Sequence, residues 1–143
     1  MIRQGQPGHI FVGRLAHGAD LLGELTRVAA EKGIRCGRVE AIGAVSRARV
    51  GYYDQAAKKY GYLEWDAPME ILALVGNISE KADAPGEPFV HAHVTLADEK
   101  GMAVGGHLAE GTVVFATEFR IEELSGVSLV RRPDEATGLA LWS

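Results

Sequence analysis

The spacing of apolar and polar residues predicts one amphipathic helix near the N-terminus, over residues 20–32. Apolar side chains recur there at helical spacing, at Leu21, Leu22, Leu25, Val28 and Ala29. Such a pattern is typical of a helix that buries one face. Asp20 offers a carboxylate that can cap the first turn, and Gly33 supplies the left-handed position at which helices commonly end.

The rest of the chain carries strand signals separated by turns. Strand signals cover eight segments, and together these predict about seven strands: 9–15, 35–45, 47–53, 58–65, 69–78, 89–97, 102–108 and 112–124. Residues 69–78 are rich in Ile, Leu and Val with little alternation, so we expect this strand near the centre of the sheet, covered on both faces. Residues 81–88, with two prolines and a glycine, are expected to form a surface loop. Strands in consecutive hairpins with one main helix predict an α+β domain built on a central, mostly antiparallel sheet.

Length and composition predict a single globular domain over residues 1–143. Hydrophobic residues make up 47% of the chain and charged residues 24%, the balance of an ordinary packed protein. Fifteen Lys and Arg against nineteen Asp and Glu give a net charge of -4, which disfavours unaided binding to nucleic acid. A local basic patch stays open as an alternative, because cations gather in the first half at Arg35, Arg38, Arg47, Arg49, Lys58 and Lys59.

The sequence predicts a cytoplasmic protein that does not enter a membrane. Its apolar runs are far shorter than the roughly 20 residues of a membrane-spanning helix. Residues 1–8 lack the apolar region of a secretory signal. Cys36 is the single cysteine, so it forms no internal disulfide, in keeping with a reducing compartment.

Histidine provides the clearest candidate chemistry. In the strand predicted over residues 89–97, His91 and His93 alternate with Ala92. Both imidazoles therefore lie on one face, about 7 Å apart along the strand, and can converge on one ion. The alternative interpretation is a pair of hydrogen-bonded histidines on a polar sheet face.

The turn that follows decides whether His107 joins the pair. It ends in Gly101, as a three-residue hairpin loop does when its last position is left-handed. With that loop Asp98 pairs with Met102, and His107 lies directly opposite His93. A two-residue loop would turn His107 to the other face. The three-residue loop predicts three imidazoles with an open fourth position, a recognised site for zinc or a similar divalent metal.

Other candidate residues carry weaker signals. Glu118, in an otherwise apolar strand, is open to three roles besides that of a solvent-facing residue: a fourth ligand, a partner to a ligand, or a general base. Glu70 has the same ambiguity. Cys36 lacks any sign of activation and is interpreted as a small buried side chain. His9 and His17 are expected to be surface or capping residues.

Several motifs together resemble the plants-and-prokaryotes-conserved (PPC) domain family. They are residues 41–45 (AIGAV), 69–76 (MEILALVG), 91–98 (HAHVTLAD), 101–108 (GMAVGGHL) and 131–139 (RRPDEATGL). The resemblance implies an α/β domain with a central antiparallel sheet, assembly into homotrimers, and metal at His91, His93 and His107. The family also carries a DNA-binding label. In its plant members a basic AT-hook outside this domain supplies that activity, and no such core occurs here.

Three functions are compatible with these residues. The first is a homotrimeric metal-binding module that recognises a small molecule or a partner chain. The second is a metal-dependent hydrolase or lyase, in which a carboxylate such as Glu118 moves the proton. The third is a DNA-binding or transcription-associated protein whose arginines are assembled into a basic surface by trimer symmetry. Whether the protein is an enzyme is left open by the sequence.

Overall fold

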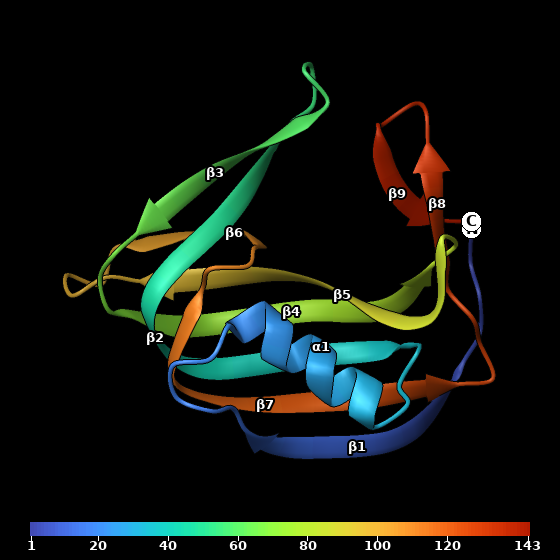
Figure 1. The fold of residues 1–143 in the computed structure, drawn as a ribbon, viewed down its shortest axis with the longest axis horizontal. Helices are drawn as coiled ribbons and strands as arrows, with labels where there is room; N and C mark the ends of the chain where they lie inside the picture. The colour runs from blue at the N-terminus through green and yellow to red at the C-terminus, as the bar shows by residue number, and fades with distance from the viewer.

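A computed structural model describes all residues 1–143 and contains one helix and one large sheet (Figure 1). The elements in chain order are β1 (Gln6–Arg14), α1 (Leu21–Glu31), β2 (Gly37–Asp54), β3 (Lys59–Trp65), β4 (Met69–Lys81), β5 (Ala84–Ala97), β6 (Ala103–Leu108), β7 (Val113–Ser125), β8 (Val130–Asp134) and β9 (Leu139–Trp142). The predicted α+β class is confirmed. The number of strands is nine where the sequence predicts about seven.

The helix α1 forms where the apolar spacing predicts it. Leu21, Leu25 and Ala29, four residues apart, are its buried side chains, so one stripe of the helix packs on the sheet. The Asp20 side chain caps the N-terminus, and Gly33 follows the last turn with φ of 68°. The protein contains no helix with the length and hydrophobicity needed to cross a membrane.

The Asp20 carboxylate also ties the helix to the sheet. One of its oxygens accepts the N–H of Gly23 at 2.8 Å, and the other accepts the N–H of Gly111 at 2.6 Å. We expect Asp20→Ala to lower the free energy of unfolding by about 2 kcal/mol, the sum of a helix cap and a second hydrogen bond. Urea denaturation checks this. Asp20→Asn, which keeps one acceptor, should lose about half as much, and a loss for Asp20→Ala under about 0.5 kcal/mol would contradict the assignment.

Strand β2 organises the sheet because it pairs with four other strands. The order of strands is β1-β7-β2-β6-β5-β4-β8-β9, with β3 paired to β2 and a further pairing between β2 and β4. Its first half lies between β4 and β7, while its second half pairs with β3 and β6. The pairing of β4 with β8 is parallel and the others are antiparallel.

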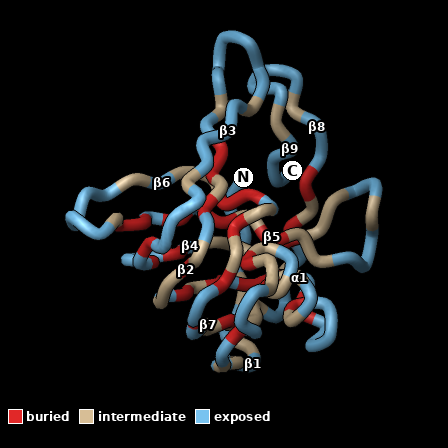
Figure 2. Tube along the Cα trace, turned by 60° about the vertical axis from the view of Figure 1, so that its left-hand side comes forward, coloured by how far each residue is buried: buried red, intermediate tan, exposed pale blue.

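The hydrophobic core lies on the side of the sheet that α1 covers (Figures 1 and 2). Along β5 the side chains alternate: Val90, Ala92 and Val94 are buried in the core, whereas His91 is half-buried and His93 is exposed. Successive side chains of a strand point to opposite faces. The two histidines therefore lie on the outer face of the sheet, away from the helix.

The expectation that residues 69–78 are covered on both faces is wrong. β4 does lie inside the sheet, between β2, β5 and β8. Its outer face is open, however, with Leu72 53% and Val75 51% exposed. The apolar run reflects an uncovered apolar surface, a case that hydrophobicity alone does not distinguish from burial.

The other differences concern strand ends. β2 runs without a break through Ser46, where two segments are predicted, and the predicted loop over 81–88 already belongs to β5 from Ala84 onward. β8 and β9 are not predicted at all, because they are short and their side chains are largely exposed.

Two hairpins, β2–β3 and β8–β9, project from the same edge of the sheet (Figure 1). Their tips are joined by two hydrogen bonds. Tyr53 donates its hydroxyl to the carbonyl of Thr137 at 2.8 Å, and Lys58 donates from Nζ to the carbonyl of Glu135 at 2.7 Å. The C-terminal hairpin is therefore held near the outer face that carries the histidines.

Candidate metal centre

The hairpin between β5 and β6 has the three-residue loop that the sequence predicts. The N–H of Asp98 donates to the carbonyl of Met102 at 3.1 Å, and Gly101 is left-handed with φ of 75°. The Asp98 carboxylate also accepts the N–H of Met102 at 2.8 Å. In the resulting register His93 pairs directly with His107. The predicted position of His107 is confirmed.

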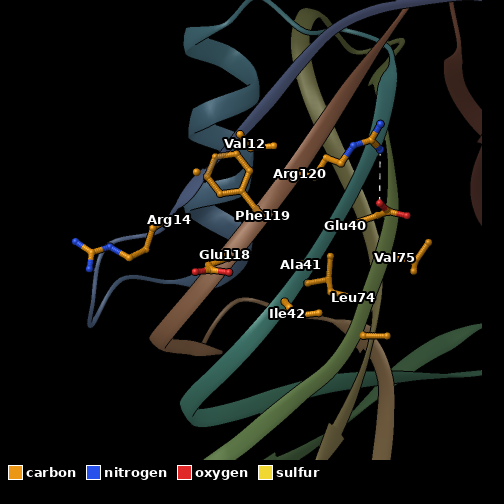
Figure 3. A pocket seen from close by; sticks show the side chains of 12 residues that line it. Val12, Arg14, Glu40, Ala41, Ile42, Leu74, Val75, Glu118, Phe119 and Arg120 are labelled. Carbon is orange, nitrogen blue, oxygen red and sulfur yellow. Dashed lines mark ion pairs between the residues drawn. The ribbon is translucent and has the colours of Figure 1, made fainter.

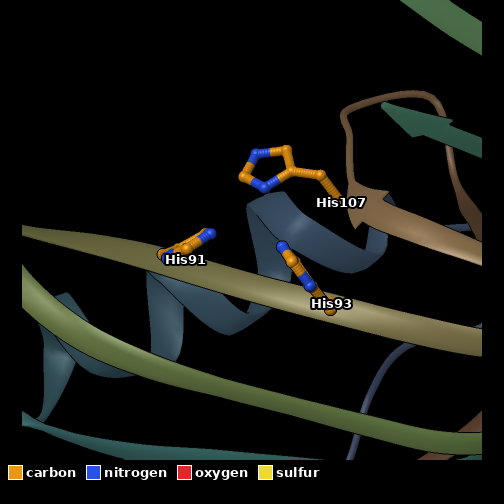
Figure 4. A group of neighbouring side chains, drawn as sticks. All are labelled: His91, His93 and His107. Atoms are coloured by element: carbon orange, nitrogen blue, oxygen red, sulfur yellow. The ribbon is translucent and has the colours of Figure 1, made fainter. Parts of the chain in front are cut away.

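The three imidazoles converge on one point of the outer face. One potential ligand atom from each of His91, His93 and His107 lies within 4.8 Å of the other two. Their ring centroids are 5.2 Å apart for His91 and His93, 5.0 Å for His91 and His107, and 5.7 Å for His93 and His107. Figure 4 shows the rings turned toward the space between them. Two neighbouring strands supply all three.

The environment keeps two of the imidazoles neutral. Burial is the main cause that lowers the pKa of His91 to about 4, and the neighbouring Arg131, His107 and His93 lower it further by disfavouring a second positive charge. The pKa of His107 is lowered mainly by burial, then by His93 and Arg131. A histidine must be deprotonated to ligate a metal. Both residues therefore have the required protonation state at neutral pH.

The three imidazoles of the cluster are suitable ligands for a metal ion. Nδ1 of His107 is buried and has no hydrogen-bond partner in the protein, although buried polar atoms are nearly always paired. A cation bound between the histidines would supply the missing partner. Three imidazole ligands without a thiolate suit zinc and similar divalent metals, and zinc held by three protein ligands keeps a fourth position open.

The glycine pair that precedes His107 is explained by close backbone contact. A Cβ atom at Gly105 would lie 2.4 Å from the carbonyl oxygen of Val94, and one at Gly106 would lie 2.7 Å from that of Gly51. Neighbouring strands leave no room for a side chain at either position. These glycines allow β6 to sit between β5 and β2, which places His107 in the cluster.

Arg131 of β8 is the neighbour of the cluster that sequence analysis missed. Its Nη2 atom lies 3.2 Å from Nδ1 of His91. The same guanidinium donates to three oxygens at 2.9 Å, those of Ser79, Asn77 and Ala140. The sequence places Arg131 at the start of the motif over residues 131–139 that resembles the PPC family, but it gives no indication of which strand lies beside this motif.

The carboxylates singled out from the sequence lie elsewhere. Glu118 lines a groove of about 650 Å³ on the outer face, together with Val12, Arg14 and Phe119 (Figure 3). Glu70 lines a separate pocket beside Glu99. Neither residue belongs to the histidine cluster, so neither serves as its fourth ligand within this chain.

The remaining candidates have the positions expected for them. Cys36 is buried, and burial raises the pKa of its thiol, which leaves it in the unreactive form. His9 and His17 are exposed; a ring nitrogen of His9 bonds the Glu123 carboxylate at 3.0 Å and one of His17 bonds the Phe115 carbonyl at 2.8 Å.

Three of the six cations of the first half that could form a basic patch are closely paired with carboxylates. Arg47 and Arg49 both pair with Glu64, at 2.8 and 3.0 Å, and Arg38 pairs with Glu40. Arginines neutralised in this way have less to offer a phosphate backbone.

Comparison with known families identifies the architecture. The family model of the Plants and Prokaryotes Conserved domain, abbreviated PCC or PPC, matches residues 2–125. The chain belongs to the PPC family. A PPC protein from Pyrococcus horikoshii is 35% identical, with a TM-score of 0.92 over 100% of this chain and 97% of that one. The structure of a metal-containing protein from Archaeoglobus fulgidus is 42% identical, with a TM-score of 0.92 over 100% of this chain and 99% of that one.

The PPC domain also resembles part of a larger protein. The bifunctional protein GlmU of Synechococcus sp. (strain JA-2-3B'a(2-13)) is 34% identical over 131 residues, which cover 90% of this chain and 19% of that protein. The chain thus spans about a fifth of the length of the curated relatives that it matches. The similarity concerns the PPC domain alone.

Proposed function

We propose that this PPC protein is a homotrimeric metal-binding module that holds zinc at His91, His93 and His107 and receives a small molecule or a partner chain. The observation that carries the proposal is the convergence of three imidazoles from two paired strands, within 4.8 Å of one another. The unpartnered Nδ1 of His107 supports it. So does the relation, at 42% identity, to a protein described as metal-containing.

The open outer face of the sheet supports self-association. Apolar side chains on several strands are more than half exposed there, namely Ile10, Val12, Ile42, Leu72, Val75 and Phe115. Val12, Ile42 and Val75 line one groove on this face, and a large exposed apolar patch is typical of a protein interface. A symmetric homotrimer, the assembly that the family resemblance implies, would cover it.

Zinc in such a site keeps one coordination position open for water or a ligand. A hydrolase or lyase would also need a group that moves a proton at that position. The cluster has no carboxylate member, and Glu118 lies in the outer-face groove instead. We therefore favour binding over catalysis.

The direct test is metal analysis of the purified full chain after expression with zinc available. We expect about one equivalent of zinc per chain. Size-exclusion chromatography with light scattering should give about three times the 15.3 kDa mass of one chain. Metal below about one tenth of an equivalent would reject the metal site, and a monomeric mass would reject the trimer.

A further inference from the structure

Arg131 is a buried cation that has no carboxylate partner in this chain. The residue is 7% exposed, and its three oxygen acceptors are neutral: the Ser79 hydroxyl, the Asn77 amide and the Ala140 carbonyl. None of the ion pairs of the protein includes it. Buried charges in proteins are normally paired. An anion from outside the chain would supply the missing charge.

The hydrogen bond between Arg131 and His91 competes with metal ligation by His91. A guanidinium can only donate, so Nδ1 of His91, 3.2 Å from Nη2 of Arg131, must accept. A neutral imidazole has one nitrogen that can accept, because the other carries the proton. Ligation through Nδ1 would take the lone pair that Arg131 occupies. Ligation through Nε2 would move the ring proton to Nδ1, which could then no longer accept from Arg131. One of the two interactions must be released for the other to form.

Release of this hydrogen bond leaves donors of Arg131 without acceptors. Nη2 keeps its bond to Asn77 and has one N–H free, and Nη1 has one N–H beyond the bond to Ala140. Both free N–H groups belong to a guanidinium that lies beside a site to which the metal ion has added positive charge. The preferred acceptor of such paired donors is a carboxylate, which matches the planar fork of arginine.

We propose that the metal-loaded site binds a small molecule bearing a carboxylate, which accepts hydrogen bonds from Arg131 beside His91. This inference rests on the metal site of the proposed function and names the class of ligand that the site takes. Arg131 has a different role in each state: without metal it donates to His91, and with metal it donates to the ligand.

A pocket of fitting size adjoins these groups. It has a volume of about 370 Å³ and is lined by Val75, Gly76, Asn77, His91 and His93. Sites for small molecules span roughly 300–1,000 Å³, so this pocket suits a ligand at the lower end of that range. Asn77 both lines the pocket and holds Arg131 through its amide oxygen, which joins the guanidinium to the pocket wall.

The test uses the full chain loaded with Co²⁺, whose visible absorption reports changes at the metal. The protein is titrated with sodium acetate at constant ionic strength, and separate titrations use sodium chloride and inorganic phosphate. We expect a saturable spectral change with acetate and none with chloride. In Arg131→Gln the apparent Kd for acetate should rise at least about tenfold, as expected for loss of a charged hydrogen-bonding partner. The exposed neighbour Arg132 provides the matched control, and Arg132→Gln should bind acetate as the wild type does.

Cobalt content, measured on every sample, separates the possible failures. A wild-type chain with about one equivalent of cobalt and no response to acetate overturns this inference alone. Less than about a tenth of an equivalent overturns the proposed metal site as well. A response to phosphate without one to acetate overturns the carboxylate class. Because Arg131 is buried, Arg131→Lys is the second variant. It keeps the positive charge but lacks the planar guanidinium, so its apparent Kd for acetate should lie between those of wild type and Arg131→Gln. Wild-type affinity in either folded Arg131 variant overturns the role of Arg131.

Discussion

Replacing His107 with alanine is expected to lower the zinc content of the purified chain from about one equivalent to under about one tenth. His91 and His93 would remain on β5, but two imidazoles fall short of the three protein ligands that an open zinc site needs. Zinc per chain, determined by elemental analysis after dialysis against buffer of defined zinc concentration, is the measurement.

His17→Ala is the matched control for this experiment. It removes an imidazole of the same kind from the exposed surface, where His17 bonds the carbonyl of Phe115, and should leave the zinc content unchanged. Full zinc occupancy in His107→Ala, or an equal loss in His17→Ala, would show that the cluster is not the site. Circular dichroism of each variant checks that the sheet is intact.

The largest loss of stability is expected for Gly43→Ala. Gly43 has φ of 136°, and a Cβ atom there would lie 2.1 Å from the carbonyl oxygen of Ala116 and 2.8 Å from Cα of Thr117. Both contacts are with the backbone of β7, which cannot move without breaking its pairing with β2. We expect the free energy of unfolding to fall by about 3 to 4 kcal/mol, a large share of the total for a domain of this size. Urea denaturation measures the change.

Gly18→Ala separates the steric clash from the cost of an unusual backbone angle. Gly18 also has a positive φ, of 77°, but a Cβ atom there would meet nothing within 4 Å. This variant should lose about 1 kcal/mol, the cost of placing an L-residue in the left-handed region. Equal losses in the two variants would refute the close approach of β7 to Gly43.

The histidine cluster was predictable because its geometry is set within a short stretch of chain. The alternation of His91 and His93 fixes their common face, and Gly101 fixes the loop that brings His107 opposite. The helix was predictable for the same reason, since its capping residue and apolar stripe are adjacent in sequence. In both cases the governing interactions are local.

Arg131 was not predictable because its position depends on pairing between distant segments. β8 lies beside the end of β4, and the side chain then reaches Ser79 and Asn77, more than fifty residues earlier in the chain. The open face of β4 was missed for a related reason. An apolar strand in the middle of a sheet has the same composition whether its outer face is covered by the same chain or is open to contact with a second chain.

The family match ends at residue 125, so it includes the three histidines and stops before Arg131. The histidines lie on β5 and β6, whereas the guanidinium beside them comes from β8, a strand of the C-terminal hairpin. A relative with a different C-terminal hairpin would keep the same metal while accepting another ligand. Exchange of this hairpin between two PPC proteins is accordingly a simple route to transfer ligand preference without rebuilding the sheet.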